Sequence, residues 1–98
     1  MSRFRLTPQA EADLEAMAEY YRDKSPAAGD RVAVAIEQRC RRAAAHPLMG
    51  TPREELGAGV RTSPVAPYLI FYRPEPGGVQ VLRVVHGARD IDPPMFDL

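Results

Sequence analysis

The amino-acid sequence predicts an α+β fold, in which an N-terminal strand and an α-helical hairpin precede a three-stranded antiparallel sheet. Apolar residues recur at helical spacing on both sides of a helix-start signal near residue 25, which predicts two successive helices. From residue 60 onward, apolar and aromatic runs of strand length alternate with short turns. The 98 residues provide one hydrophobic core, so we expect a single domain over residues 1–98.

The chain begins with a short strand, followed by the first helix. Residues 3–7 alternate polar and apolar side chains, as a half-buried strand does. Thr7 suits a helix N-cap and Pro8 the first helical position, and the helical spacing continues to about residue 23. Ala16 and Tyr20 form a flanking stripe, which leaves room for a second neighbour. The main core stripe consists of Ala10, Leu14, Met17 and Tyr21.

The second helix is predicted from Pro26 to about His46, because Ser25 and Pro26 repeat the cap-and-proline signal. Only a tight turn separates the two helices, which predicts an antiparallel helical hairpin. Asp13 on the first helix and Arg39 on the second lie close to the apolar faces of their helices. We therefore predict an ion pair between these two residues.

Three strands are predicted in the C-terminal half. Residues 60–63 form a weak strand, whereas 68–72 are continuously apolar and aromatic, as in a central strand buried on both faces. A glycine-containing turn leads to the third strand at 79–85, which makes the last two strands an antiparallel hairpin. In a regular strand Arg83 and His86 point to opposite faces. Arg83 then shares its face with Val79, Val81 and Val85.

Composition and charge limit the function classes. Thirteen basic and thirteen acidic residues cancel, whereas a nucleic-acid-binding domain usually has a basic footprint. No run approaches the roughly 18 consecutive apolar residues of a membrane helix, and the N-terminus lacks the apolar stretch of a secretory signal. The single cysteine, Cys40, cannot form an internal disulfide and is expected to be buried. We therefore expect a cytoplasmic protein without membrane contact.

Residues that could carry chemistry are few. The sequence contains no phosphate-binding loop and no metal-ligand spacing, so we expect no cofactor and no metal. One cluster is suggestive: Arg61, Arg83, His86 and Arg89. Arg61, Arg83 and His86 would suit a metal-free ribonuclease, in which arginines bind a phosphodiester and a histidine moves its proton. The alternative is a strand-end histidine among surface arginines that form salt bridges.

Several short segments follow one another with a specific order and spacing. They are Phe4-Arg5-Leu6-Thr7 leading into Ala10 and Asp13-Leu14, His46-Pro47 with Gly50, Glu55-Leu56, Val60-Arg61, Tyr68-Leu69-Ile70-Phe71-Tyr72-Arg73, and Val81-Leu82-Arg83-Val84-Val85-His86-Gly87-Ala88-Arg89-Asp90. Taken together, they resemble the ParE branch of the RelE/ParE toxin superfamily over essentially the whole chain. The fold of that superfamily agrees with the order of elements predicted above.

The resemblance implies the toxin of a type II toxin–antitoxin system, neutralised by a ParD-like antitoxin in a hetero-oligomer. Such antitoxins bind operator DNA, so the toxin would reach DNA only indirectly. ParE-like members are associated with inhibition of DNA gyrase by protein–protein binding, whereas RelE-like members cut messenger RNA on the ribosome. The neutral charge and the single lysine, Lys24, favour a gyrase inhibitor without catalytic residues. A ribosome-dependent endoribonuclease is the alternative.

Two partner surfaces are expected. Two helices on one face of a small sheet would leave the other face and an edge strand exposed, and an antitoxin segment would cover them with a strand and a helix. The predicted antitoxin contacts are Ala16, Tyr20 and Val32, unless these residues complete the intramolecular core. The predicted target contacts are Arg83, His86, Arg89, Met95 and Phe96, of which the last two alternatively dock on the sheet of the same chain.

Overall fold

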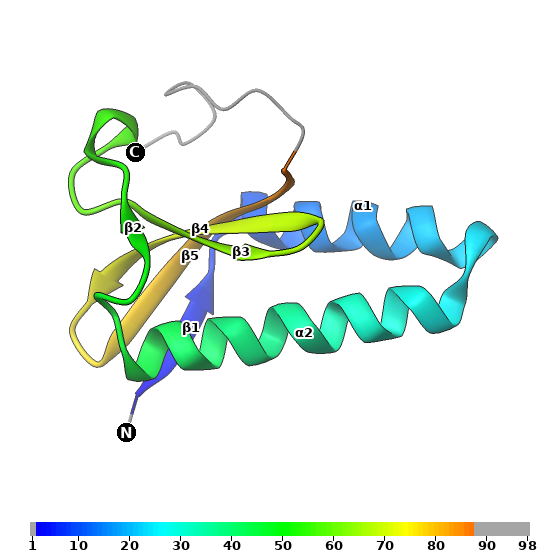
Figure 1. Cartoon of the computed structure of the whole chain (residues 1–98), viewed down its shortest axis with the longest axis horizontal. Helices are drawn as coiled ribbons and strands as arrows, with labels where there is room; N and C mark the ends of the chain where they lie inside the picture. The colour runs from blue at the N-terminus through cyan, green and yellow to red at the C-terminus, as the bar shows by residue number, and fades with distance from the viewer. Residues whose placement is uncertain (1, 88–98) are drawn as a thin grey trace.

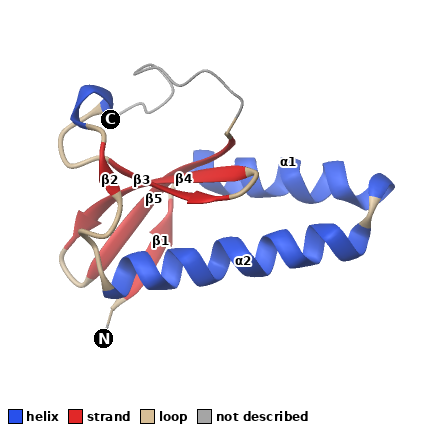
Figure 2. Ribbon diagram, in the orientation of Figure 1, coloured by secondary structure: helices blue, strands red, loops and turns tan. Residues whose placement is uncertain are grey.

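The computed structural model describes residues 2–87, in which an α-helical hairpin lies against one face of a β-sheet (Figure 1, Figure 2). This arrangement confirms the predicted α+β class. No helix in the described part of the chain is long and apolar enough to cross a membrane. The elements follow in the order β1 (Arg3–Leu6), α1 (Pro8–Lys24), α2 (Pro26–Ala45), β2 (Thr51–Pro52), the 3₁₀ helix η1 (Glu54–Leu56), β3 (Arg61–Val65), β4 (Tyr68–Glu75) and β5 (Gly78–His86).

Within residues 2–87 the sheet has five strands in the order β1-β5-β4-β3-β2, one strand more than the sequence predicts. The extra strand, β2, has two residues, which is too short to produce a hydrophobic pattern. β1 runs parallel to β5, with Leu6 opposite Val81, whereas the other neighbouring strands are antiparallel. β1 and β2 form the two edges, and β1 is the longer of them.

Both predicted helix starts are confirmed. The hydroxyl groups of Thr7 and Ser25 each accept a hydrogen bond from the backbone N–H three residues later, at 3.1 and 3.3 Å. Ser25 also ends α1, because its N–H donates to the Tyr21 carbonyl at 2.9 Å. A Cβ atom on Gly29 would lie 2.6 Å from the Cβ of Tyr21. The close approach of the two helices beside their turn therefore requires glycine at this position.

The main core lies between the helices and the sheet. Ile36 and Cys40 of α2 belong to the same buried cluster as Ile70 and Tyr72 of β4. Phe71, which lies between these two β4 residues, is equally buried but belongs to a cluster on the other face of the sheet. β4 is therefore buried on both faces, as its continuous apolar sequence predicts.

The face of the sheet away from the helices is covered, contrary to the expectation from the sequence. Phe71, Leu82 and Val85 pack there against Leu56 and Val60, and each of the five side chains is at most 5% exposed. Leu56 ends η1, which lies in the connection between β2 and β3. A connecting segment with two apolar residues thus supplies the cover that the pattern of helices and strands does not reveal.

A β-bulge in β5 changes the faces predicted for its residues. Val81 and Arg83 lie opposite two neighbouring residues of β4, which leaves Leu82 as the extra residue. The predicted regular alternation is therefore wrong beyond Val81, because one added residue reverses the side-chain parity. Val84, rather than Val85, joins Val81 in the helix-side cluster.

Asp13 pairs with Arg83 of β5, so the predicted ion pair between Asp13 and Arg39 is wrong. Arg83 donates to both carboxylate oxygens at 2.7 and 2.9 Å, and the Val84 N–H donates to one of them at 2.9 Å. The two side chains are 14% (Asp13) and 13% (Arg83) exposed. Because β1 ends opposite Val81, Asp13 takes over part of the β5 edge beyond it. Arg39 donates instead to the buried hydroxyl of Ser63 at 2.9 Å.

Candidate partner-binding site

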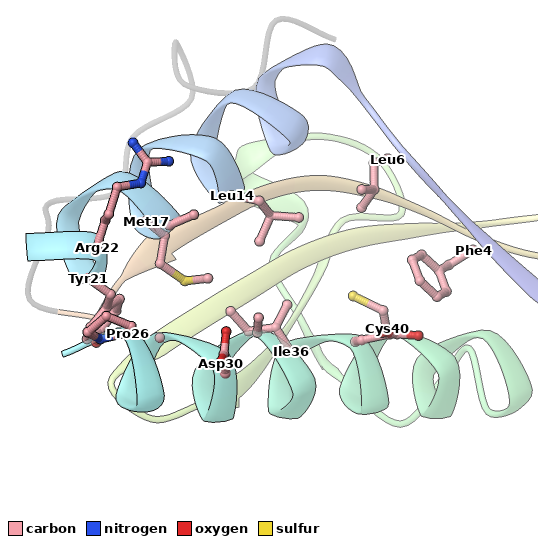
Figure 3. A pocket seen from close by; sticks show the side chains of 14 residues that line it. Phe4, Leu6, Leu14, Met17, Tyr21, Arg22, Pro26, Asp30, Ile36 and Cys40 are labelled. Atoms are coloured by element: carbon pink, nitrogen blue, oxygen red, sulfur yellow. The ribbon is translucent and has the colours of Figure 1, made fainter.

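An apolar groove of about 500 Å³ lies between α1 and α2, as Figure 3 shows. Met17 of α1 and Ile36 and Cys40 of α2 form its floor and are buried. Phe4 and Leu6 of β1 extend the lining to the edge of the sheet. The groove therefore draws its lining from three elements that are separated in the sequence.

Small residues account for the hollow between the helices. Ala18 of α1 and Gly29 and Ala33 of α2 line it, and none of them has a side chain large enough to fill the space. Leu14 and Tyr21 of α1 also line the groove and are only half-buried. The sequence assigned Leu14 and Tyr21 to the core stripe. In the structure these residues pack against the core and also line the groove.

Charged side chains occupy the rim of the groove. Arg22 of α1 lines one side, and Asp30 and Glu37 of α2 line the other. Glu37 also accepts a hydrogen bond from Arg41 at 2.8 Å on the exposed surface of α2. An apolar floor with both signs of charge at its rim suits the apolar face of an amphipathic helix.

The unpaired edge of β1 borders this groove. β1 bonds to β5 on one side and is the terminal strand of the sheet, so its other side presents unpaired backbone groups. Arg5 donates to the Glu75 carboxylate at 2.6 and 2.8 Å, which lowers the pKa of Glu75. The Phe4 ring lies 5.9 Å from the guanidinium carbon of Arg41. An extended peptide that added to this edge would lie directly beside the groove.

The groove floor contains a thiol, and that thiol is not a nucleophile at neutral pH. Cys40 is 1% exposed, which confirms its predicted burial. Burial, and secondarily the charge of Glu37, raise the pKa of Cys40 to about 11. The thiol therefore stays protonated and acts as a small apolar surface.

The antitoxin contacts predicted from the sequence lie outside the groove lining. Ala16 and Tyr20 are on the exposed side of α1, where Tyr20 is 55% exposed and the Lys24 ammonium lies 4.9 Å from its ring centroid. Val32 is half-buried against the main core. The sequence did contain a signal for the groove, namely the small residues Ala18 and Ala33 within apolar stripes. That signal gains meaning only once the two helices are placed face to face.

The three candidate nuclease residues have separate partners. Arg61 donates from Nη1 to the carbonyls of residues 48 and 50, at 3.1 and 2.7 Å. Arg83 forms an ion pair with Asp13. The ring of His86 lies edge-to-face against Tyr68, with centroids 5.6 Å apart. None of the three lines the groove.

The environment of Tyr68 affects its ionisation. Burial, followed by a side-chain hydrogen bond with Tyr21, raises the pKa of Tyr68 to about 12. The phenol next to His86 is therefore protonated at physiological pH. The other predicted target contacts, Arg89, Met95 and Phe96, lie outside the described residues.

Three comparisons with known proteins bear on this arrangement. A family model described as the ParE toxin of the type II toxin–antitoxin system, parDE, matches residues 4–91. Among solved structures, the chromosomal ParDE TA system from P. aeruginosa contains a similar chain with a TM-score of 0.70 and 24% sequence identity. The match covers 88% of this chain and 96% of that chain, and at this identity it concerns the fold. Comparison with curated proteins found no match.

Proposed function

This chain belongs to the ParE family of toxins of parDE type II toxin–antitoxin systems, and from this membership we propose that it inhibits DNA gyrase by protein–protein binding and is neutralised by a ParD-like antitoxin. The apolar groove beside the unpaired edge of β1 carries the antitoxin part of the proposal. The gyrase part rests on the family resemblance and on the neutral charge of the chain. The proposal includes a cytoplasmic location, where both proposed partners would be met.

In this proposal the antitoxin uses the edge and the groove together. An extended segment pairs its backbone with β1, and an adjoining helix lays its apolar face over the groove. On α1 the lining runs from Leu14 to Arg22, which is about 12 Å along the helix axis. A partner helix of two to three turns matches this length, with apolar residues at i, i+4 and i+7.

The charges around the site set the register of the antitoxin. Arg3 on β1 favours an acidic residue in the added strand, because opposite charges on neighbouring strands attract. Arg22 on one rim and Asp30 on the other favour opposite charges along the two sides of the helix.

Substitution of Ala18 by glutamate tests the groove. The glutamate side chain would extend over an apolar floor that the antitoxin needs, while its position four residues before Arg22 creates a favourable i,i+4 pair that supports the helix. We expect antitoxin affinity to fall at least about 30-fold for Ala18→Glu, measured by calorimetry with the purified ParD-like antitoxin.

Two other exposed alanines of α1 provide matched variants. Ala12→Glu makes the same change outside the groove lining, and we expect it to leave the affinity within about twofold. Ala16→Glu tests the contact predicted from the sequence. If Ala16→Glu weakened binding and Ala18→Glu did not, the antitoxin would lie on the outer side of α1 and the groove proposal would be wrong.

Supercoiling of plasmid DNA by purified gyrase tests the target. We expect the added protein to reduce supercoiling or to accumulate cleaved DNA, and we expect the antitoxin to reverse this effect. Unchanged supercoiling at saturating protein, together with cleavage of ribosome-bound message, would replace the gyrase inhibitor with the endoribonuclease. Arg61, Arg83 and His86 would then be the first residues to substitute.

A further inference from the structure

A second surface lies where α2 leads into β2. The connecting segment displays two adjacent large apolar side chains, since Leu48 is 71% exposed and Met49 is 38% exposed. Neither residue belongs to the buried clusters of the described chain. Burying two adjacent apolar side chains against another protein surface is favourable in water.

This exposed segment is held in place by buried groups. The Tyr72 hydroxyl accepts a hydrogen bond from the Gly50 N–H at 2.8 Å and donates one to the Pro47 carbonyl at 2.9 Å. Arg61 donates to the carbonyls of Leu48 and Gly50. These four bonds fix the backbone on both sides of the exposed pair. A contact surface ordered in advance loses less conformational entropy when it binds.

Two arginines and a histidine lie next to the exposed pair. Arg39 and Arg42 of α2 and the C-cap residue His46 stand at i, i+3 and i+7 and, with Met49, line a hollow of about 410 Å³. Within residues 2–87 no carboxylate forms an ion pair with any of these three residues. Arg39 is positioned by its bond to Ser63, which uses one of its five N–H donors.

Helix α2 itself accounts for only part of this charge. Arg42 lies in the last turn, where the helix dipole favours a cation. That effect explains one positive charge at this end of α2. It does not explain the second arginine, the hollow between them or the ordered apolar pair beside them.

We propose that a cationic platform docks onto an acidic protein surface of the toxin's target. The platform consists of Arg39, Arg42, His46, Leu48 and Met49. The proposal rests on the proposed function, because it takes the chain to be a toxin with a protein target. Carboxylates of the target occupy the hollow, and an apolar pocket receives Leu48 and Met49. Arginine and methionine are the residue types enriched in the centres of protein interfaces.

A protein fits this platform better than a nucleic acid does. Single-stranded nucleic acids are bound by aromatic side chains within a broad basic surface, whereas this platform has aliphatic side chains on a neutral chain. The platform is also separate from the groove. Arg42 follows Ala33 by nine residues, which is about two and a half turns and places the two on opposite sides of α2.

Arg42→Glu and Leu48→Asp test the platform, and Arg31→Glu serves as the matched control. Arg31 lies on the same side of α2, about 16 Å before Arg42, and its substitution changes the net charge equally. Each variant is expressed from an inducible promoter with growth as the readout. Each purified protein is also tested for binding to the antitoxin, to immobilised gyrase at low and high salt, and to a DNA duplex.

We expect Arg42→Glu and Leu48→Asp to relieve growth arrest and to weaken gyrase binding at least roughly tenfold, with antitoxin affinity within about twofold of wild type. The salt dependence of gyrase binding should shrink for Arg42→Glu, and Arg31→Glu should behave as wild type. Retained antitoxin binding shows that a variant is folded.

Full toxicity of both Arg42→Glu and Leu48→Asp would show that the platform proposal is wrong. Binding to the DNA duplex that depends on Arg42, without such dependence for gyrase, would also overturn it. Failure of the wild-type protein to bind gyrase would instead defeat the gyrase target. In that case the growth phenotypes still decide whether the platform carries toxicity.

Discussion

The two sides of helix α2 are built in opposite ways. On one side, small residues leave an apolar groove that nothing in the described chain fills. On the other side, Tyr72 and Arg61 order a segment that displays apolar side chains beside cations. Salt screens the attraction between surface charges, whereas the burial of apolar surface involves no charge and is not screened. One helix can therefore support two contacts that respond differently to ionic strength and to substitution.

The largest expected effect concerns the attachment of α1, which forms one wall of the groove. Asp13→Ala removes three hydrogen bonds and leaves Arg83 without its carboxylate in a largely buried position. We expect the free energy of unfolding to fall by roughly 3 kcal/mol, measured by urea denaturation. Glu37→Ala removes an exposed pair on α2 and should cost under about 0.5 kcal/mol.

Asp13→Ala also tests whether the groove and the platform are independent of each other. Antitoxin affinity should fall for Asp13→Ala because the groove wall is loosened, while hydrogen exchange at the Gly50 amide should stay as in wild type. Equal acceleration of exchange at Gly50 would show that groove and platform form one cooperative unit, and the contrast between them would then lose its basis.

The buried thiol in the groove floor predicts that the free energy of unfolding depends on pH in the alkaline range. The pKa of Cys40 is raised from about 9 to about 11, so the folded state favours the protonated thiol. The protonated thiol contributes its full stabilisation of the fold below pH 9. This stabilisation is lost as the pH rises from 9 through 11, because the unfolded chain releases the thiol proton in this range while the folded chain retains it. We expect a loss of roughly 2–3 kcal/mol in unfolding free energy over this window.

Cys40→Ala isolates this contribution. Tyr68 also titrates near pH 12, so the relevant quantity is the difference between wild type and Cys40→Ala at each pH. Parallel stability curves for the two proteins between pH 9 and 11 would show that water already reaches the groove floor.

A smaller effect is expected on the platform. Tyr72→Phe removes the acceptor for the buried Gly50 N–H and the donor to the Pro47 carbonyl, and we expect a loss of about 2 kcal/mol. Exchange at the Gly50 amide should accelerate, and gyrase binding should weaken as the platform loses its order. Tyr20→Phe, on an exposed ring, should change stability by less than about 0.5 kcal/mol.

The helices were predictable because their signals are local. Thr7 and Ser25 each cap a helix within three residues of their own position, and the short turn at Ser25 allows only an antiparallel hairpin. The central strand was predictable for a related reason, since burial on both faces removes polar residues from a continuous stretch. The family could be inferred because the order and spacing of its short sequence segments can be read directly from the chain.

Other features depended on residues that are far apart in the sequence. Asp13 and Arg83 are 70 positions apart, and Arg83 is identified as the partner of Asp13 only by the position of β5 beside α1. The bulge at Leu82 places the residues of β5 that follow it on the opposite faces from those expected. Side chains alternate regularly between the two faces only in a strand without an extra residue. Ala16 and Tyr20, the contacts predicted on α1, lie on its exposed side, whereas the groove lies on the other side of the same helix.

The sequence by itself determined which segments form helices and strands, which strand is buried on both faces and which family the chain resembles, because each of these is written in neighbouring residues. Only the tertiary structure decided what the segments enclose. Ala18, Gly29 and Ala33 are ordinary small residues until two helices face each other and leave a groove between them. Leu48 and Met49 belong to an ordinary loop until Tyr72, more than 20 residues later in the chain, fixes its backbone. Cavities and ordered surfaces arise from non-local packing, which no local pattern specifies.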